Sequence, residues 1–490
     1  MHIIRDCAKF WNRFADYPKT NKKTAKSWQI DSTPGWFCDS SSDSEVVIDC
    51  EQKFKFSYYN LVYKTSDAVL VYNTASEAIV SFTNDEFNAI EIWLRSNLNP
   101  IQIEDIQALA RQGIIVYENE DELFKIKYII NSSVYNTARI KSFVIYPTTE
   151  CNARCFYCFA HDDIIHGQKM SKETADSLLD FIVGHIEDGD EVVFRWFGGE
   201  PLMACDVIDY IICSFRERLN TTEYSSIITT NASLIDEKLL EHAVSVWHLK
   251  KLLIPVDGAQ NSHNKRKNYK ERTTVNHYKA LLDVIHLVLE KGIYCVTRVN
   301  LDHNNIAEFE QILKDLHSFG SHPNFYLQAT TLHTPEFLAK CRNSVFYKTE
   351  EYEVLYAMLF RKMLEYGFYR TAAEIVPRRQ LSVCEAKLNN HFLVSSDGHI
   401  YACEQEAHLP SNSIGHCKYG ISHNKNISKW INGDVAKECA ECQYLPICLG
   451  GCSYYRNRKD GLVSPCTRAK YYMPALLKLV QEEIDAKIIK

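Results

Sequence analysis

The chain of 490 residues lacks any run of about 18 consecutive apolar residues, the length that a membrane-spanning helix needs. Its first residues also lack the sustained apolar segment and small-residue cleavage site of a secretory signal. A basic excess is missing too, because 62 Asp and Glu residues outnumber 55 Lys and Arg residues, and such a chain has no general attraction for nucleic acid or anionic membranes. We therefore expect a cytoplasmic protein with neither nucleic acid nor a membrane as its partner.

Cysteine, by contrast, is abundant. The chain has 18 cysteines, together with the 46% hydrophobic and 24% charged residues that are typical of a large globular protein. Because cytoplasmic reductants keep thiols reduced, a disulfide framework is not expected in a chain of this length. Metal binding or catalysis is therefore the leading interpretation of the cysteines.

Four segments are predicted along the chain. Residues 1–50 contain a Ser- and Asp-rich run and are expected to form a flexible lead-in. Residues 51–137 combine short alternating segments with two helix-like runs and a further strand, which predicts a small winged-helix-like module. Six strand candidates alternate with helices in residues 138–370, which predicts an α/β barrel-like unit with a parallel sheet. Residues 371–490 form a cysteine-rich segment with a predicted hairpin and a closing helix.

The segment CNARCFYC places Cys151, Cys155 and Cys158 on one loop directly after the first predicted strand. Three thiolates at this spacing can hold three irons of a [4Fe-4S] cube and leave the fourth iron open to another ligand. A closed structural zinc site needs four ligands, so zinc with a remote fourth ligand is the alternative.

Further polar features lie at neighbouring strand ends. Tyr157 precedes the third cysteine, the segment FGGEP at residues 197–201 ends the second predicted strand, and Asn231 ends the third. We expect backbone donors and the carboxylate of FGGEP to hold an ammonium group. Because ligands of parallel sheets sit at the C-terminal ends of the strands, these features are expected to share one site.

CNARCFYC and WFGGEPL are similar to the radical S-adenosylmethionine (radical SAM) superfamily over about residues 141–330. The resemblance implies a partial (β/α)6 barrel with a [4Fe-4S] cluster on the three loop cysteines and SAM on its open iron. Electron transfer to SAM would then yield a 5′-deoxyadenosyl radical that abstracts hydrogen from the substrate. The resemblance places Gly198, Gly199 and Glu200 at the amine of SAM and Tyr157 near its adenine. Ala232 departs from the family, which often has Gly there.

Other residues of the predicted barrel are less specific. Asn231 and Arg298 are expected to face the cofactor, Arg298 together with Asn300 on one face of the fifth strand. A buried structural hydrogen bond is the alternative for that pair. Asp257 and His263 could touch substrate after the fourth strand, although a turn and a loop cap are the favoured interpretation.

Seven tail cysteines follow the spacing C-x13-G-x4-C, then C-x2-C-x5-C-x3-C, then C. The pattern resembles the SPASM extension of radical SAM enzymes over about residues 371–470. The resemblance assigns two auxiliary [4Fe-4S] clusters, three clusters in all: one to Cys439, Cys442, Cys448 and Cys466, and the other to Cys384, Cys403 and Cys452. Cys417 is a candidate fourth ligand of the second cluster, and an iron open to substrate is the alternative. Zinc on the same thiolates is the alternative metal.

SPASM enzymes mostly modify peptides, and residues 51–137 resemble a leader-recognition module that pairs an extended peptide with a sheet edge. The resemblance implies an enzyme, a maturase that forms a C–S, C–C or C–O crosslink in a ribosomally made precursor peptide with a leader. An electron donor such as flavodoxin or ferredoxin would be a second partner. The alternatives are an anaerobic sulfatase maturase that forms formylglycine and, in another class, a non-enzymatic zinc scaffold.

Glu404 directly follows Cys403, the position where formylglycine-forming relatives place a general base. A carboxylate beside a cluster could take a proton from the nucleophile of the substrate. A solvated Glu in the CEQEA loop is the alternative.

Overall fold

The computed structural model describes residues 1–5, 52–96, 101–135, 139–158, 167–270, 276–332, 347–407, 409–422, 424–458 and 464–486. Most of the predicted lead-in, residues 6–51, lies outside the described residues. No helix in the described part of the chain is long and apolar enough to cross a membrane.

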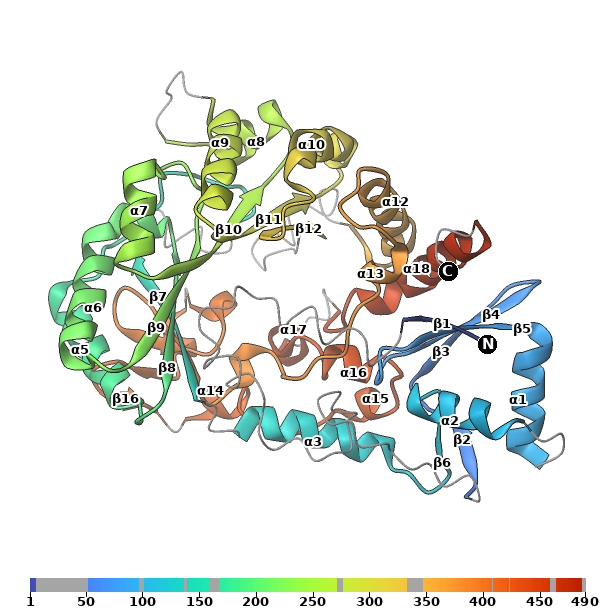
Figure 1. Cartoon of the computed structure of the whole chain (residues 1–490). Coiled ribbons are helices and arrows are strands. Elements are labelled where there is room, and N and C mark those ends of the chain that lie inside the picture. The colour runs from blue at the N-terminus through green and yellow to red at the C-terminus, as the bar shows by residue number, and fades with distance from the viewer. Residues whose placement is uncertain are drawn as a thin grey trace.

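A sheet of ten strands forms the centre of the molecule, in the order β12-β11-β10-β9-β8-β7-β13-β14-β15-β16 (Figure 1). Its first six strands pair in parallel with their neighbours in the chain. They are β7 (Ile140–Thr148), β8 (Glu191–Gly198), β9 (Glu223–Thr229), β10 (Leu249–Val256), β11 (Tyr294–Leu301) and β12 (Phe325–Thr331). The predicted parallel sheet is confirmed, and its strands end at one common edge.

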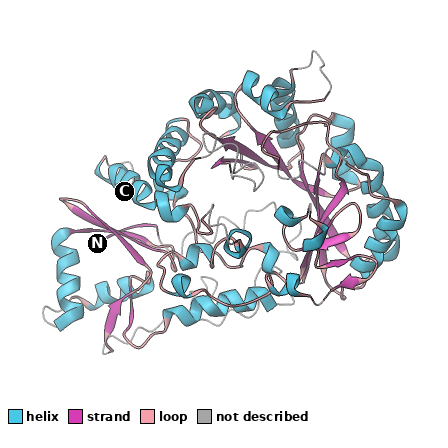
Figure 2. Ribbon diagram, turned by 180° about the vertical axis from the view of Figure 1, so that it is seen from behind, coloured by secondary structure: helices cyan, strands magenta, loops and turns pink. Residues whose placement is uncertain are grey.

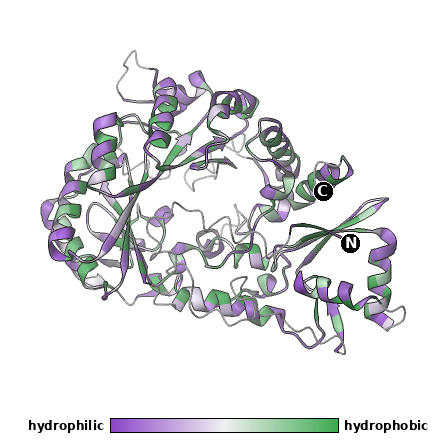
Figure 3. Ribbon diagram, viewed as in Figure 1, coloured by the Kyte–Doolittle hydropathy of each residue, from purple (hydrophilic) through white to green (hydrophobic). Residues whose placement is uncertain are grey.

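Helices between these strands cover the outer side of the curved sheet (Figures 1 and 2). They are α5 (Lys172–Val183), α6 (Cys205–Arg218), α7 (Glu237–Ser245), α8 (Gln260–Lys267), α9 (His277–Glu290) and α10 (Phe309–Leu316), and α12 (Tyr352–Glu365) follows β12. Several begin at polar caps; the Ser171 side chain, for example, accepts the Thr174 N–H. Hydrophilic and hydrophobic residues lie on different faces of these helices (Figure 3), the pattern of elements that cover a core.

Strand side chains alternate between the helices and the barrel interior. Along β8, Val192, Phe194 and Trp196 belong to the main core under the helices. Arg195 and Phe197 therefore point to the opposite side, toward the interior. On the other parallel strands, the same alternation directs every second side chain toward the barrel interior and away from the core under the helices.

The tail extends the same sheet. β13 (His391–Val394) pairs in parallel with β7, followed by the antiparallel strands β14 (His399–Tyr401), β15 (Gly415–His416) and β16 (Gly420–Ile421). The predicted hairpin therefore joins β13 to β14, with Gly398 at φ 89° in its turn. The closing helix is α18 (Ala469–Asp485).

The N-terminal segment forms an antiparallel sheet of the order β1-β5-β4-β3 and a separate pair of strands, β2 and β6. The strands are β1 (His2–Arg5), β2 (Phe54–Phe56), β3 (Asn60–Lys64), β4 (Ala68–Asn73), β5 (Ile79–Thr83) and β6 (Ile115–Tyr117). The helices are α1 (Asn84–Ser96), α2 (Ile103–Arg111) and α3 (Glu122–Tyr135). Residues 2–5 were expected in the lead-in and instead form an edge strand that pairs with β5. Local patterns did not predict this strand, because its partner lies far away in the sequence.

The N-terminal sheet docks onto the tail. The Tyr72 hydroxyl donates to the Pro377 carbonyl at 2.6 Å, and the Thr74 hydroxyl donates to the Gln443 carbonyl at 2.6 Å. In return, the Gln443 side-chain amide donates to the Asn60 carbonyl at 3.0 Å. The sheet is thus fixed beside the tail segment that carries Cys439 and Cys442.

Candidate functional site

The three loop cysteines lie together at the C-terminal end of β7. Cys151, Cys155 and Cys158 share one small cluster with Ala153 and Tyr269. The three cysteines are not joined in disulfides, and burial raises the pKa of the Cys151 thiol to about 11. A thiolate at this position therefore needs a metal or another cation to stabilise it.

The donor set fits a multi-iron cluster. Within the described residues, no three His, Cys, Asp or Glu side chains converge on a single metal ion. A cube cluster binds each thiolate through a different iron, so its ligands need not converge on one point. Three thiols on one loop match the three protein ligands of a [4Fe-4S] cube with one open iron, whereas a structural zinc ion needs four ligands.

The end of α8 holds the backbone of the cysteine loop. The Arg154 N–H donates to the carbonyls of Lys267 at 2.9 Å and Asn268 at 3.1 Å. The Lys270 N–H donates to the Asn152 carbonyl at 2.8 Å. Asn268 caps α8 with φ 48° and ψ 63°, a left-handed conformation that Asn tolerates. These contacts fix the loop conformation through protein groups alone.

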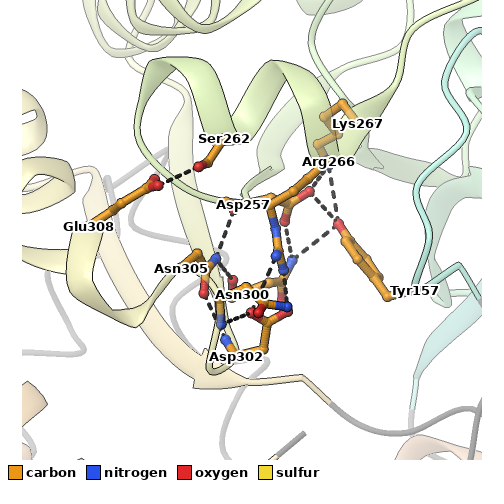
Figure 4. A network of polar contacts seen from close by, with 10 residues as sticks. Tyr157, Asp257, Ser262, Arg266, Lys267, Asn300, Asp302, Asn305 and Glu308 are labelled. Atoms are coloured by element: carbon orange, nitrogen blue, oxygen red, sulfur yellow. Dashed lines mark hydrogen bonds and ion pairs between the residues drawn. The ribbon is translucent and has the colours of Figure 1, made fainter. Parts of the chain in front are cut away.

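Tyr157 is anchored in a buried polar network (Figure 4). Its hydroxyl donates to Asp257 Oδ2 at 2.6 Å, and Lys267 Nζ lies 3.0 Å from the same oxygen. The Asn300 amide donates to Asp257 Oδ1 at 3.0 Å. Burial opposes ionisation of Asp257, but the Lys267 ammonium group outweighs it and holds the pKa of this carboxyl at about 2. The network therefore contains a charged, buried ion pair.

This network settles the places of Asp257 and His263. Asp257 is fully buried among protein partners, which agrees with a structural role. His263 Nδ1 accepts the Asp257 backbone N–H at 3.3 Å, and burial lowers the pKa of His263 to about 3. His263 is therefore a neutral, buried residue that contacts the backbone of Asp257.

The two glycines of FGGEP allow a close approach between strand ends. Gly198 has φ 110°, and a methyl group at Gly199 would lie 2.0 Å from the Glu150 carbonyl oxygen. The Gly199 N–H donates to the Thr148 carbonyl at 3.1 Å, and the Glu200 N–H donates to the Glu150 carbonyl at 2.8 Å. These two donors are occupied and an ammonium group itself requires acceptors, so the Glu200 carboxylate stays the predicted contact for an ammonium group.

Glu200 joins the ends of β8 and β9. Its buried carboxylate accepts the Thr230 hydroxyl at 2.7 Å, the Asn231 N–H at 2.8 Å and the Leu202 N–H at 3.2 Å. Burial raises the pKa of Glu200, whereas these donors act in the opposite direction. A carboxylate has about four acceptor positions, so these three bonds leave capacity for one further donor.

Asn231 joins the end of β9 to the cysteine loop. Its amide donates to Asn152 Oδ1 at 2.8 Å, and its own oxygen accepts the Ser233 N–H at 3.0 Å. Ala232 has φ 65°, a left-handed conformation that costs a residue with a Cβ about 1 kcal/mol. This backbone conformation explains why Gly would suit the position.

Four tail cysteines gather near the N-terminal sheet. Burial raises the pKa of the Cys448 thiol to about 11, and charges on Cys442, Cys439 and Cys466 act in the same direction. The four thiols that the SPASM resemblance groups are therefore close enough to interact, and their role as ligands stays a prediction. The Arg456 guanidinium donates to Cys439 Sγ at 3.1 Å and places a cation beside the group.

A second group of tail cysteines lies toward the barrel interior. Burial raises the pKa of the Cys403 thiol, and charges on Cys384, Glu404 and Cys452 raise it further. The structure therefore brings together the three cysteines that the SPASM resemblance groups, with Glu404 beside them. Their role as ligands stays a prediction.

Cys417 lies apart from this group. Its N–H donates to the Gly398 carbonyl at 2.8 Å, because β15 pairs with β14 and puts Cys417 at the turn end of β14. Cys403 follows the other end of β14, so the two residues lie at opposite ends of that strand. The structure does not bring Cys417 to the second group, although it is near in sequence.

The sequence did not reveal Lys267 and Arg468. Lys267 is buried on α8, where one of three consecutive basic residues in a polar helix carries no signal of burial. Arg468 precedes α18, and its guanidinium reaches the Thr331 carbonyl at 2.8 Å, at the end of β12. Both residues act across long sequence separations that local patterns do not show.

Residues 145–316 match the model of the radical SAM superfamily. The chain carries a radical SAM domain. Such domains are enzymes that use SAM with an iron–sulfur cluster, and the match includes Cys151, Cys155 and Cys158.

Curated relatives support this assignment. The radical SAM cyclopropyl synthase TigE of Paramaledivibacter caminithermalis is 25% identical over 303 residues, 54% of this chain and 58% of its own length. A cysteine-type anaerobic sulfatase-maturating enzyme of Clostridium perfringens is 23% identical over 356 residues, 65% of this chain and 90% of its own length. The chain spans less than two thirds of the length of the synthase.

A solved structure shares the fold. Native anSMEcpe with bound AdoMet and the Cp18Cys peptide superposes with a TM-score of 0.55 at 17% sequence identity. The superposition covers 71% of this chain and 99% of that chain. The likeness places the barrel of this chain among radical SAM folds.

Proposed function

We propose that the chain is a SPASM-type maturase that abstracts hydrogen from a ribosomally made precursor peptide and installs a C–S, C–C or C–O crosslink. Cys151, Cys155 and Cys158 would hold a [4Fe-4S] cluster, with SAM contacted by residues at the ends of β8 and β9. When bound, these cofactors supply a radical strong enough to remove a hydrogen atom from carbon. The protein orients the substrate and excludes water.

The tail cysteines support an oxidative outcome. Closing a bond onto a substrate radical releases one electron, and this electron needs an acceptor. Two auxiliary [4Fe-4S] clusters, on the group with Cys448 and the group with Cys403, would accept it. A flavodoxin or ferredoxin would supply the electron that starts the reaction.

An open sheet edge is the observation that carries the proposal. β3 is the outer strand of the N-terminal sheet, and its Val62 side chain is 45% exposed. The Asn60 carbonyl points outward to Gln443, so the backbone groups of Val62 and Lys64, two and four residues on, face the same open edge. We propose that the leader of the precursor adds there as a further strand, since β1 already covers the edge of β5.

Two substitutions at one position test this edge. Val62→Pro removes the N–H that strand addition requires, whereas Val62→Thr keeps both the N–H and a β-branched side chain. The precursor encoded beside the gene should bind Val62→Pro about tenfold more weakly than the wild type and bind Val62→Thr normally, as measured by calorimetry. A leaderless peptide should not distinguish the two variants. Equal precursor binding by both variants would place the leader elsewhere.

An anaerobic sulfatase maturase is a second candidate, favoured by the position of Glu404. Glu404 is half-buried beside Cys403, where a carboxylate could take a proton from the substrate. A peptide with the cysteine of a sulfatase site should then lose sulfur and gain an aldehyde. The 29% of the chain that lies outside the superposition with anSMEcpe (100 − 71) favours the first proposal, because it leaves room for a leader-binding module.

A further inference from the structure

Two neighbouring strands turn polar side chains into the barrel interior. On β11, Cys295, Val299 and Leu301 belong to the core under the helices, so Arg298 and Asn300 face the other way. Arg298 pairs with Gln328 of β12, and Asn300 pairs with Thr330. Polar residues therefore form a continuous inner surface across β11 and β12.

Arg298 is a partly buried cation on this surface. Its Nε atom is buried and has no hydrogen-bond partner among the described residues. It also forms no ion pair with any carboxylate in the described part of the chain. Arginine stays protonated in proteins, and an unpaired charge that is partly removed from water is destabilising. The position is therefore suited to an anion from outside the chain.

Arg468 adds a second guanidinium group to the same region. It donates to the Thr330 hydroxyl, to the Thr331 carbonyl at 2.8 Å and to the Tyr356 hydroxyl at 3.3 Å. After burial, the charge of Arg468 is the largest influence that lowers the pKa of Arg298. The two cations therefore add to one positive electrostatic potential near the ends of β11 and β12.

The pair lies between the two cysteine regions. Asn300, two residues beyond Arg298 on the same face, donates to the Tyr157 hydroxyl at 3.5 Å, beside the cysteine loop. The charge of Glu404, next to Cys403, also reaches Arg298. A substrate that reacts at the cysteine loop and passes an electron to the tail must occupy this interior space.

We propose that Arg298, reinforced by Arg468, binds the carboxylate of an acidic side chain in the substrate peptide. The inference rests on the proposed function and specifies its substrate class, a core peptide with Asp or Glu near the reacting residue. The guanidinium fork can donate two parallel hydrogen bonds to a carboxylate, which no amide can match. The other source of a carboxylate here is SAM itself.

Binding of paired probe peptides tests the proposal on reconstituted protein with SAM. The probes are acetyl-Gly-Glu-Gly-Glu-Gly-amide and its Gln twin, measured by calorimetry. Loss of a charge-assisted hydrogen bond is worth about 1.5 to 3 kcal/mol, so the Glu peptide should bind the wild type about tenfold or more tightly than the Gln peptide. This preference should fall below about twofold in Arg298→Gln and be partly retained in Arg298→Lys, which keeps the charge without the fork.

Arg216→Gln is the matched control, because it removes one positive charge from the exposed end of α6. It should keep the full preference for the Glu peptide. Thermal unfolding of Arg298→Gln and Arg298→Lys shows that the variants fold. Equal binding of both peptides to the wild type, or binding of neither, overturns the proposal.

The affinity for SAM separates the two sources of carboxylate. Arg298→Gln should bind SAM within about twofold of the wild type, since one lost contact to the cofactor would cost far more. A loss of about tenfold or more in SAM affinity, without a peptide preference, would assign Arg298 to the cofactor and overturn the proposal. A Glu preference in an enzyme that never forms a crosslink would overturn the proposed function alone.

Discussion

The cysteine loop after β7 and the cysteine groups of the tail hold their thiols in different ways. The loop is fixed by hydrogen bonds to the end of α8 and by the buried Lys267–Asp257 pair, to which the Tyr157 hydroxyl donates a hydrogen bond. The tail thiols lie on turns and very short helices such as α15 (Lys437–Ala440) and α16 (Leu445–Cys448). Helices of this length are not stable alone. The loop is therefore preorganised by protein contacts, whereas the tail should depend on metal for its structure.

Removal of iron should have the largest effect, and it should fall on the tail. Anaerobic chelation is expected to lower the free energy of unfolding of the tail by about 3 kcal/mol or more, because metal binding and folding are coupled at such sites. Hydrogen exchange should accelerate strongly in residues 437–457 and only slightly in residues 151–158. Cys448→Ala should reproduce the tail effect, and Cys155→Ala should not. Equal exchange in both regions after chelation would refute the comparison.

Asp257→Asn should have the next largest effect, and it should fall on the loop. It leaves the buried Lys267 charge unpaired, so we expect a loss of about 3 to 5 kcal/mol in denaturant unfolding. Since folding lowers the pKa of Asp257 to about 2, the ion pair contributes its stability above the unfolded pKa of about 3.9 and loses it as the pH falls toward 2. The mutant should therefore lack that part of the acid dependence. An unchanged acid profile would show that the pair does not stabilise the loop.

Tyr157→Phe should have a moderate effect. It removes the 2.6 Å hydrogen bond to Asp257 and keeps the aromatic ring, so a loss of about 1 to 2 kcal/mol is expected. Tyr210→Phe is the control, because the Tyr210 hydroxyl bonds to the half-buried Asp176 on helix α5, away from the cysteine loop. In apo protein, alkylation of the neighbouring cysteines should be faster in Tyr157→Phe than in the control. Identical alkylation rates would mean that Tyr157 does not hold the loop.

Cys417→Ala should have the smallest effect. Cys417 is buried at the turn end of β14, so truncation costs only about 1 kcal/mol from lost packing. Iron content and the spectra of the auxiliary clusters should match those of the wild type. A lost or altered cluster would show that Cys417 reaches the second cysteine group when metal is bound.

Local spacing predicted much of this molecule. The six parallel strands followed from their apolar runs, because each run lies within a short stretch of sequence. The grouping of Cys448 with three other thiols was implied by the SPASM resemblance of the tail. The pairing of β1 with β5 could not be predicted in this way, since the two strands are far apart in the chain. The contacts of Lys267 with Tyr157 and of Arg468 with β12 could not be predicted for the same reason. The place of Cys417 depends on strand register.

The hydrogen balance of the product tests the central claim most directly. Reduced, reconstituted enzyme is incubated with SAM and the full-length precursor, and peptide mass and 5′-deoxyadenosine are measured together. The account predicts that each crosslink removes two hydrogen atoms from the peptide, with deoxyadenosine formed in step, and that Cys155→Ala abolishes both. Deoxyadenosine formation with an unchanged precursor, or conversion of a cysteine to an aldehyde, would contradict it.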